Sequence, residues 1–247
     1  MIRRIVTAIA PRPEQCLVEI GPGQGAITLP LLKAAGRLQV IEMDRDLVGP
    51  LADRCAPAGE LIVHNQDALR TDFCALRNGH ARIRVVGNLP YNISTPLLFH
   101  LLAQAGCIED MHFMLQREVV DRMCAAPASR ARGRLSVMVQ YHCRPERLFG
   151  IGPGAFRPPP RVESAFVRLL PHRTPPVAVD DYRTFEALVR QAFSHRRKTL
   201  ANALKGLLTA TQIEAAGVDP GARAERLDLA AFAALANGAY RVASGEE

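Results

Sequence analysis

A glycine-rich segment, Gly21 to Gly25, directly follows an apolar run that ends at Ile20, and it is the first part of the sequence that could bind a ligand. Glycines at such a turn let backbone N–H groups approach a ligand closely, and the N-terminus of a following helix favours anions. Gly21, Gly23 and Ala26 also have the spacing of a dinucleotide-binding turn. A tight turn that serves only packing is the alternative, and the parallel sheet predicted around it favours the ligand site.

Two carboxylates follow the next apolar runs. Glu42 ends the run 38–41 and lies 21 residues beyond Gly21, where a carboxylate can accept two hydrogen bonds from ribose hydroxyls of NAD or of S-adenosylmethionine (SAM). Asp67 follows the run 61–64 and could accept a hydrogen bond from the exocyclic amine of an adenine ring. The alternatives are a surface carboxylate in the first turn of a helix for Glu42 and a turn-forming residue for Asp67.

The tetrapeptide Asn88-Leu89-Pro90-Tyr91 follows a fourth apolar run, 83–86, and suits methyl transfer to an adenine amine. Adenine N6 is a poor nucleophile, so the enzyme must accept its N–H hydrogen bonds, which the Asn88 amide oxygen and the Leu89 carbonyl can do. Pro90 fixes the chain direction without adding a donor, and Tyr91 offers a ring for stacking on a flipped base. No strong general base is needed when the methyl donor carries its own leaving group. An ordinary turn after a strand is the alternative.

The elements that position these residues alternate between short apolar runs and longer amphipathic segments. This alternation predicts an α/β fold with a parallel, doubly wound sheet. The predicted strands are 16–20, 38–41, 61–64, 83–86 and 111–115. The predicted helices are a first helix before Pro11, then 26–35, 44–54 and 95–105, the last capped by Ser94 or Thr95 with Pro96 in its first turn.

The remainder of the chain has a different pattern. Residues 133–143 and 162–169 alternate with strand periodicity and could form an antiparallel edge of the sheet. A proline-containing linker follows, and after it only helical segments occur, at 182–194, 198–208, 211–216 and 229–236. We therefore predict an α/β domain at 1–172 and a small helical domain at 177–247.

The net charge of +7 is concentrated in the middle of the 247-residue chain, since residues 117–173 hold 11 Arg and four acidic side chains. Clustered cations favour a polyanionic partner because they release counterions from phosphates on binding. An Arg-rich solvated surface is the alternative.

Composition also excludes several classes of protein. No apolar run reaches 18 residues, so we expect no transmembrane helix, and the apolar stretch after Arg4 is too short for a signal peptide. The six Cys are widely spaced and none has the spacing of zinc ligands, so we expect core thiols in a reducing cytosol, no metal and a cytoplasmic protein.

Taken in order, these motifs resemble the class I SAM-dependent methyltransferases, and more narrowly the KsgA/RsmA/Dim1 family of small-subunit rRNA adenine N6-dimethyltransferases. The segments that carry the resemblance cover most of the chain: 18–25, 41–47, 66–68, 86–97, 111–122, 133–141, 156–169 and 193–205. Asn-Leu-Pro-Tyr and Phe-x-Pro-x-Pro-x-Val-x-Ser are the specific patterns. The resemblance implies a Rossmann-like doubly wound sheet with antiparallel edge strands, plus a small C-terminal all-α domain.

The resemblance also implies site residues. The cofactor-binding residues are Glu19, Gly21, Gly23, Glu42, Asp67 and Asn88. The catalytic residues are Asn88, Leu89, Pro90, Tyr91 and Phe156. Among them, Glu42 holds the ribose hydroxyls of SAM, Asp67 holds its adenine ring, and Phe156 packs near the target base from the side opposite the tetrapeptide.

The substrate that the resemblance implies is a pair of adjacent adenosines in a hairpin loop near the 3′ end of 16S rRNA, methylated during small-subunit biogenesis. Each adenosine takes two methyl groups, so four SAM are converted to S-adenosylhomocysteine. We expect the enzyme to be a monomer and to have no membrane partner. The RNA-binding candidates are Arg117, Arg134, Arg157, Arg161, Arg196, Arg197 and Lys198.

In one respect the sequence departs from the pattern. Family members have a basic N-terminal arm with a Gly-Gln-x-Phe-Leu motif before the first helix, whereas this sequence starts at about that helix. We expect weaker affinity for SAM and RNA without the arm.

Three other functions compete with this interpretation. An NAD-dependent dehydrogenase would share the glycine turn and Glu42 but has no use for the tetrapeptide. A non-catalytic assembly factor would keep the fold and use the Arg surface on the small subunit. A 23S rRNA adenine methylase of the macrolide-resistance type is related, but segments 133–141 and 193–205 favour the small-subunit family.

Overall fold

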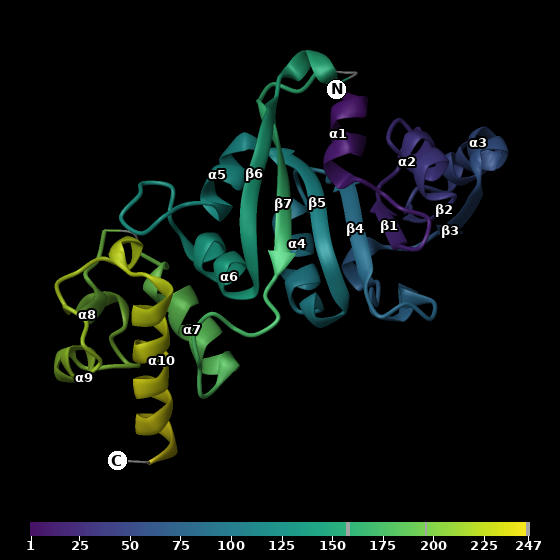
Figure 1. Ribbon diagram of the computed structural model, residues 1–247. Coiled ribbons are helices and arrows are strands. Elements are labelled where there is room, and N and C mark those ends of the chain that lie inside the picture. Colours follow the sequence, from purple (N-terminus) through teal and green to yellow (C-terminus); the bar gives the residue numbers. More distant parts are fainter. Residues whose placement is uncertain (157–158, 196, 246–247) are drawn as a thin grey trace. The chain divides into compact units, whose positions relative to one another are not determined.

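The strands predicted from the apolar runs pair into a seven-stranded sheet in the computed structural model, which describes residues 1–156, 159–195 and 197–245. The strands are β1 (Cys16–Ile20), β2 (Arg37–Ile41), β3 (Glu60–His64), β4 (Ile83–Asn88), β5 (Ile108–Gln116), β6 (Cys143–Ile151) and β7 (Ser164–Pro171). Their order is β3-β2-β1-β4-β5-β7-β6, and β7 runs antiparallel to β5 while the first five strands are parallel (Figure 1). The predicted fold class is confirmed, including the antiparallel strand at 162–169.

The first four helices follow the sequence prediction closely. They are α1 (Ile2–Ile9), α2 (Thr28–Ala35), α3 (Arg45–Cys55) and α4 (Ser94–Leu102), whereas α5 (Arg117–Met123) was not predicted. In Figure 1, α1 lies in front of the sheet and α4 behind it, as a doubly wound sheet requires. The predicted cap of the helix near 95 was wrong, because Ile93 takes the N-cap position without a side-chain bond and the Ser94 hydroxyl donates to the Tyr91 carbonyl instead.

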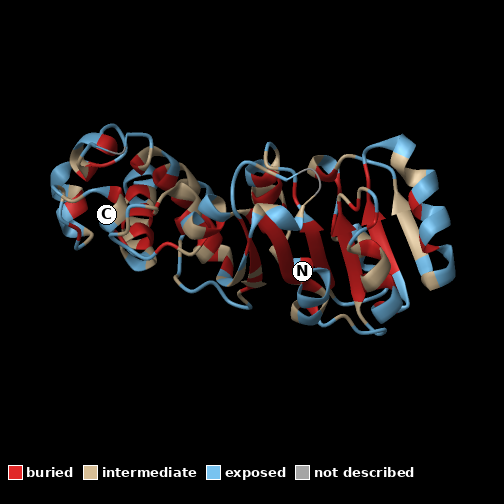
Figure 2. Ribbon diagram, turned by 90° about the horizontal axis from the view of Figure 1, so that it is seen from above, coloured by how far each residue is buried: buried red, intermediate tan, exposed pale blue. Residues whose placement is uncertain are grey.

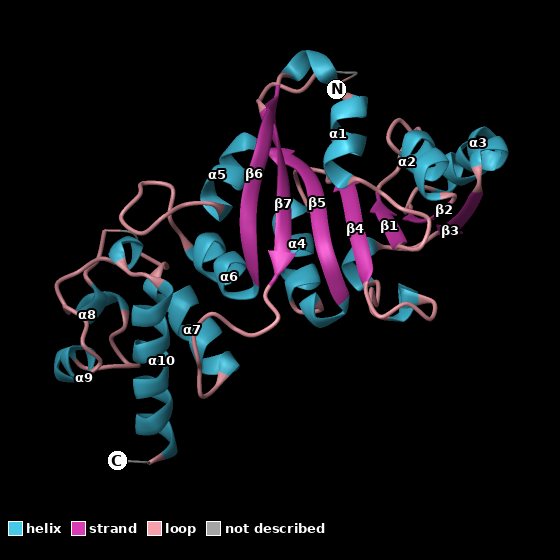
Figure 3. Ribbon diagram, viewed as in Figure 1, coloured by secondary structure: helices cyan, strands magenta, loops and turns pink. Residues whose placement is uncertain are grey.

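The predicted strand at 133–143 was wrong, because this segment is the helix α6 (Arg134–His142). Val137 and Tyr141 lie one turn apart and are both buried, so the apolar residues fit a helical face as well as an alternating one. The backbone N–H of Gly133 donates to the Ser136 hydroxyl, and the Gln140 amide donates to the carbonyls of Met123 and Ala125. The strand that sequence reasoning missed, β6, begins directly after this helix (Figure 3).

Packing divides the described chain into two units. Unit 1 comprises residues 1–120 and 144–171, and unit 2 comprises residues 121–143 and 172–247. The division into domains at 1–172 and 177–247 stays a prediction. By their packing, residues 121–143 belong to the same unit as the C-terminal helices.

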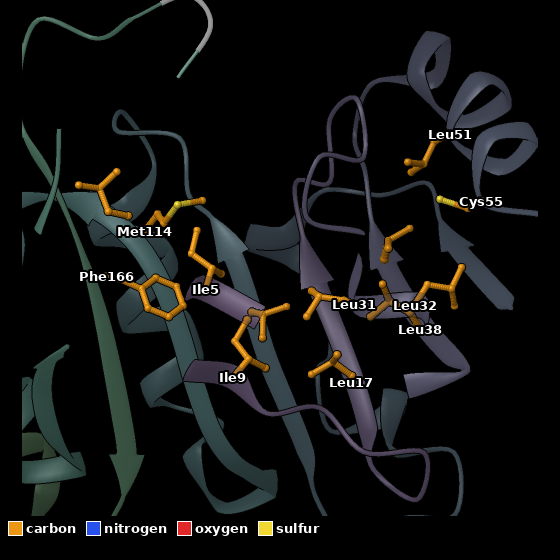
Figure 4. Close-up of a cluster of buried hydrophobic side chains, with 13 residues drawn as sticks. Ile5, Ile9, Leu17, Leu31, Leu32, Leu38, Leu51, Cys55, Met114 and Phe166 are labelled. Atoms are coloured by element: carbon orange, nitrogen blue, oxygen red, sulfur yellow. The ribbon is translucent and has the colours of Figure 1, made fainter. Parts of the chain in front are cut away.

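The core of unit 1 is a continuous apolar cluster between the sheet and its first helices. The inner strands are buried (Figure 2), except that the last residue of β4, Asn88, is exposed. In Figure 4, Ile5 and Ile9 from α1 lie between Phe166 of β7 on one side and Leu17 and Leu31 on the other, and all belong to one cluster. The apolar residues of α1 recur every three to four positions, which gives the helix one face for this core.

A buried ion pair fastens the end of α1 to the sheet. The Arg84 guanidinium donates to both carboxylate oxygens of Asp110, at 2.8 and 3.0 Å. The same group donates to the carbonyls of Ile9 (2.7 Å) and Ala10 (3.3 Å) and to the Gln15 side chain (2.7 Å). Because the charge of Asp110 and the last carbonyls of the helix satisfy its donors, Arg84 can be buried at the start of β4.

Two cysteines contradict the expectation that all six are thiols. Cys74 and Cys107 form a disulfide across a sequence separation of 33, whereas Cys16, Cys55, Cys124 and Cys143 take no part in it. Within the described residues, no group of three or more His, Cys, Asp and Glu side chains could hold a metal ion. In that same part of the chain no helix is both long and apolar enough to cross a membrane.

Unit 2 is built on the packing of α7 against α10. Besides α6, its helices are α7 (Tyr182–Ala192), α8 (Leu200–Ala203), α9 (Ala210–Ala215) and α10 (Leu229–Ser244). Asp181 caps α7 by accepting from the Thr184 N–H, and Asp228 caps α10 by accepting from the Ala231 N–H.

Short 3-10 turns occur in both units: η1 (Ala56–Ala58), η2 (Ala68–Arg70), η3 (Ala75–Arg77), η4 (Ala105–Cys107), η5 (Pro153–Ala155) and η6 (Ala224–Arg226).

His112 is a buried base beside the Arg84–Asp110 pair. It is 1% exposed, and its ring lies 5.9 Å from that of Phe166. Burial lowers its pKa to about 4, while Asp110 acts in the opposite direction and Arg84 adds to the lowering. The neutral form is therefore the one that the fold accommodates.

We expect His112 to make unit 1 sensitive to acid. Between pH 6.5 and 4 the unfolded chain binds a proton at His112 that the folded chain does not, so the free energy of unfolding falls as the pH falls. Urea titrations should show that the wild type loses about 2 kcal/mol more than His112→Leu between pH 7.5 and pH 5. Equal losses in the two proteins would contradict this assignment.

Candidate functional site

The carboxyl ends of the parallel strands bring the predicted site residues to one edge of the sheet. Ile20 at the end of β1 pairs with Ile41 of β2 on one side and with Gly87 of β4 on the other. Neighbouring strands lie about 4.8 Å apart. The loop 21–25 that follows β1 is therefore flanked by Glu42 after β2 and by the tetrapeptide 88–91 at the end of β4.

Gly87 permits this close approach. A Cβ atom built on Gly87 would lie 2.7 Å from the carbonyl oxygen of Ile20, which is shorter than any real contact of a Cβ atom. A side chain here would push the ends of β1 and β4 apart. The glycine preceding the tetrapeptide thus fixes the distance between the two halves of the site.

The loop after β1 has the backbone of a ligand-binding turn. Gly21, Gly23 and Gly25 all have positive φ, at 64°, 54° and 80°. Such a conformation strains any residue with a Cβ, and a Cβ on Gly25 would also lie 2.8 Å from Leu51. The Gly21 N–H donates to the carbonyl of Ile41, which ties the loop to β2.

Glu42 joins this loop to the end of β2. It is 7% exposed, one carboxylate oxygen accepts from the Gly23 N–H at 3.2 Å, and the other accepts from the Asp44 N–H at 2.9 Å. Each carboxylate oxygen can accept a second hydrogen bond, so Glu42 keeps capacity for two hydroxyls. The next residue, Met43, is 72% exposed and offers an apolar surface beside them.

Glu19 is a buried carboxyl of β1, two residues before the loop. It is 2% exposed, and among the described residues no hydrogen-bond partner reaches its Oε2 atom. Burial raises its pKa to about 7; the Thr28 hydroxyl works against the increase and the charge of Glu42 adds to it. A carboxyl held in this way is ready to gain a hydrogen-bond donor or a positive charge nearby.

Asp67 lies just beyond β3 and is partly exposed. Its carboxylate accepts from the Leu69 N–H at 2.9 Å, which starts the turn η2, and its carbonyl accepts from the Thr71 hydroxyl. His100 and Gln104 of the segment after β4 both contact the Thr71 carbonyl, at 2.8 and 3.3 Å. The loop that carries Asp67 is thereby fastened to the C-terminal end of α4, the helix that follows the tetrapeptide.

The tetrapeptide is anchored on one side and open on the other. Leu89 is buried, and its N–H donates to the Met114 carbonyl of β5 at 3.2 Å. Asn88 and Pro90 are exposed, and the Pro90 carbonyl accepts from the Ile93 N–H, which closes the turn into α4. Burial of the leucine thus leaves the Asn88 side chain at the surface, beside the glycine loop.

Tyr91 and Phe156 form partly buried aromatic positions in unit 1. The Tyr91 hydroxyl lies 2.9 Å from the hydroxyl of Ser164, the first residue of β7. Phe156 follows the turn η5 and packs against the apolar cluster that contains Ile5 and Ile9. The contact between Phe156 and a target base stays a prediction.

The predicted RNA-binding cations have different surroundings. Arg117 pairs with Glu163, and Arg134 pairs with Glu186 at 2.9 Å. Arg161, Arg197 and Lys198 are exposed, whereas Arg157 and Arg196 lie outside the described residues.

Arg132 was counted with the basic surface but is buried. It is 1% exposed and donates to the carbonyls of Leu227 and Ala125 and to the Gln140 side chain. Burial lowers its pKa, and Asp228 opposes that effect. Arg132 is therefore a structural residue of unit 2 rather than part of a phosphate-binding surface.

Sequence reasoning gave no functional weight to Gly87, Met43 and Ser164. Gly87 and Ser164 lie in segments that carry the family resemblance. Their positions, near the end of β4 and at the start of β7, could have identified them as functional residues. Met43 gave no such signal, because its exposure depends on the turn after β2.

Both the sequence and the fold of this chain match known proteins. A family model described as ribosomal RNA adenine dimethylase matches residues 1–239. The chain is 57% identical over 236 residues to ribosomal RNA small subunit methyltransferase A of Xanthomonas campestris pv. campestris (strain 8004), covering 96% of this chain and 90% of that protein. It is 55% identical over 237 residues to the protein of the same name from Pseudomonas fluorescens, covering 96% and 88%.

Two solved structures share the fold. A dimethyladenosine transferase from Plasmodium falciparum gives a TM-score of 0.79 at 24% identity, with 95% of this chain and 93% of that chain covered. The 23S rRNA methyltransferase ErmE gives a TM-score of 0.74 at 24% identity, with 96% of each chain covered. Both likenesses extend over the sheet and the C-terminal helices.

We expect the raised pKa of Glu19 to cost stability as the pH rises toward neutrality. Above pH 4.5 the unfolded chain releases this proton while the folded chain keeps it until about pH 7, so stability falls across that range. Glu19→Gln removes the cost, and its advantage over the wild type in urea unfolding should be about 2 kcal/mol larger at pH 8 than at pH 5. The same advantage at both pH values would be evidence against a titrating Glu19.

Proposed function

This chain belongs to the ribosomal RNA adenine dimethylase family, and on that premise we propose that it transfers methyl groups from SAM to N6 of adenosines in small-subunit rRNA. It is an rRNA adenine dimethyltransferase. The substrate in this proposal is a pair of adjacent adenosines in a hairpin loop near the 3′ end of 16S rRNA, each of which takes two methyl groups. The observation that carries the proposal is the pairing of Ile20 with Gly87, which sets the glycine loop beside the tetrapeptide.

The residues around the glycine loop fit SAM. Glu42 keeps acceptor capacity for two ribose hydroxyls, and Met43 offers an exposed apolar surface for a ring. The Glu19 oxygen that has no hydrogen-bond partner among the described residues is buried two residues before the loop and suits the positive charge at the amino-acid end of SAM. Asp67 is the acceptor for the adenine amine. Bound SAM supplies a methyl group on sulfonium sulfur together with its leaving group.

The protein's own contribution is to position the amine. The side-chain oxygen of Asn88 and the carbonyl of Leu89 accept the two N6–H bonds, which directs the nitrogen lone pair at the methyl group. Leu89 is fixed by its bond to Met114 and by burial, so its carbonyl is held in place. Tyr91 stacks on one face of the flipped base, and Phe156 packs near it from the other side. No metal has a role in this proposal.

RNA is bound by exposed cations in both units. Arg161 in unit 1 and Arg197 with Lys198 in unit 2 are exposed and can contact phosphates. Arg134 lines a cavity of about 430 Å³ in unit 2 with Arg122, Leu135 and Phe193 among its neighbours. Arg117 serves RNA only if the substrate competes with its Glu163 partner. Arg157 and Arg196 complete the proposed set.

Asn88→Ala should abolish the chemistry without abolishing binding. Losing one of two acceptors for the amine is expected to lower the rate of labelled methyl transfer from SAM to unmethylated small subunits by about 100-fold. The variant should still bind small subunits, and the control Asn202→Ala in α8 should transfer methyl at the wild-type rate. Full turnover by Asn88→Ala would refute the proposed role. Faster transfer to naked large-subunit rRNA than to small subunits would refute the proposed substrate.

Replacement of Arg197 and Lys198 by Ala should weaken binding of small subunits and reduce its dependence on salt. Each lost phosphate contact lowers the slope of log K against log salt by about 1, so the double variant should lose about 2. Arg12→Ala, which removes an exposed cation paired with Glu14, is the matched control. An unchanged slope would remove both residues from the RNA interface.

A further inference from the structure

We propose that Ser164 is a positioning residue for methyl transfer, which acts by fixing the ring of Tyr91 against the target base. The inference rests on the proposed function, because Tyr91 serves there as the stacking surface. It begins from the 2.9 Å contact between the two hydroxyls, which joins residues 73 positions apart in the sequence.

Tyr91 is held at both of its ends. Its carbonyl accepts from the Ser94 hydroxyl at 3.1 Å, and the turn that contains it is closed by the bond from the Ile93 N–H to the Pro90 carbonyl. Its phenol oxygen contacts Ser164. With the main chain and the tip of the side chain both fixed, the ring keeps one orientation, and less conformational freedom is lost when a base stacks on it.

Ser164 is suited to act as the fixed point. It is 2% exposed, and its backbone pairs with Gln116 at the end of β5. The residue before it, Glu163, is held twice by Arg117, whose N–H donates to the Glu163 carbonyl at 2.9 Å and whose guanidinium pairs with the Glu163 carboxylate. A serine on a strand secured in this way can hold Tyr91 in position.

The same contact joins the two motifs that the resemblance marked as specific. Tyr91 ends Asn-Leu-Pro-Tyr, and Ser164 ends the Phe-x-Pro-x-Pro-x-Val-x-Ser pattern that starts at Phe156. The walls of the target-base site therefore come from segments that share a hydrogen bond. A hydroxyl is needed at 164 for that bond, because a hydroxyl can act as either donor or acceptor toward the phenol.

A double-mutant cycle tests the proposal. Ser164→Ala and Tyr91→Phe each remove one hydroxyl of the pair, and each should lower kcat for methylation of small subunits by about tenfold, equivalent to about 1.4 kcal/mol. The double variant should be no slower than either single variant, because only one interaction is lost. Ser164→Thr, which keeps the hydroxyl, should retain most of the rate. The KM for SAM should stay within twofold of wild type in every case.

A control variant separates the effect of losing the Tyr91–Ser164 bond on kcat from the effect of a general loss of stability. Tyr182→Phe removes a similar 2.9 Å bond, between the Tyr182 hydroxyl and His142 in unit 2, and should leave kcat unchanged. A Ser164→Ala protein with a lower Tm but the wild-type kcat, or losses that add in the double variant, would overturn the positioning role. Failure of the proposed function would differ, since the wild type itself would then transfer no methyl to small subunits.

Discussion

The pairing of Ile20 with strands on both sides is the constraint on which the site depends. One neighbour delivers Glu42 to the glycine loop and the other delivers the tetrapeptide, so two halves of a reaction meet at one strand end. Gly87 sets how closely they meet, since any larger residue would contact the Ile20 carbonyl. Cofactor and target base are in this way held by a rigid backbone, while the side chains select what binds.

Charges inside the protein fall into two groups with different consequences. Arg84 and Arg132 have their donors satisfied by carbonyls and by Asp110 or Gln140, so they stabilise the fold around them. Glu19 has no partner on one oxygen among the described residues, and burial raises its pKa to about 7. The first group belongs to structure, and the second is a cost to stability of the kind found at sites that bind a charged ligand.

Much of this architecture could be predicted from the sequence, because parallel strands are apolar throughout and are separated by amphipathic helices. The family and the fold class were predicted from motifs at strand ends, and the NAD-dependent dehydrogenase is excluded by the family match. Residues 133–143 were misassigned because the apolar residues of so short a segment fit both a two-residue and a 3.6-residue period. The burial of Arg132 and the bond from Tyr91 to Ser164 could not be foreseen, since each depends on segments distant in the sequence.

The outer strand β6 has a consequence for how the protein behaves at high concentration. A sheet that ends in a bare strand can recruit a strand from another molecule through its unpaired amides and carbonyls. Along β6, Pro145 contributes no amide hydrogen, and the charged residues Arg144, Glu146 and Arg147 lie at exposed positions. A second molecule would have to desolvate these charges and forgo one hydrogen bond, so sheet-to-sheet polymerisation is disfavoured at this border.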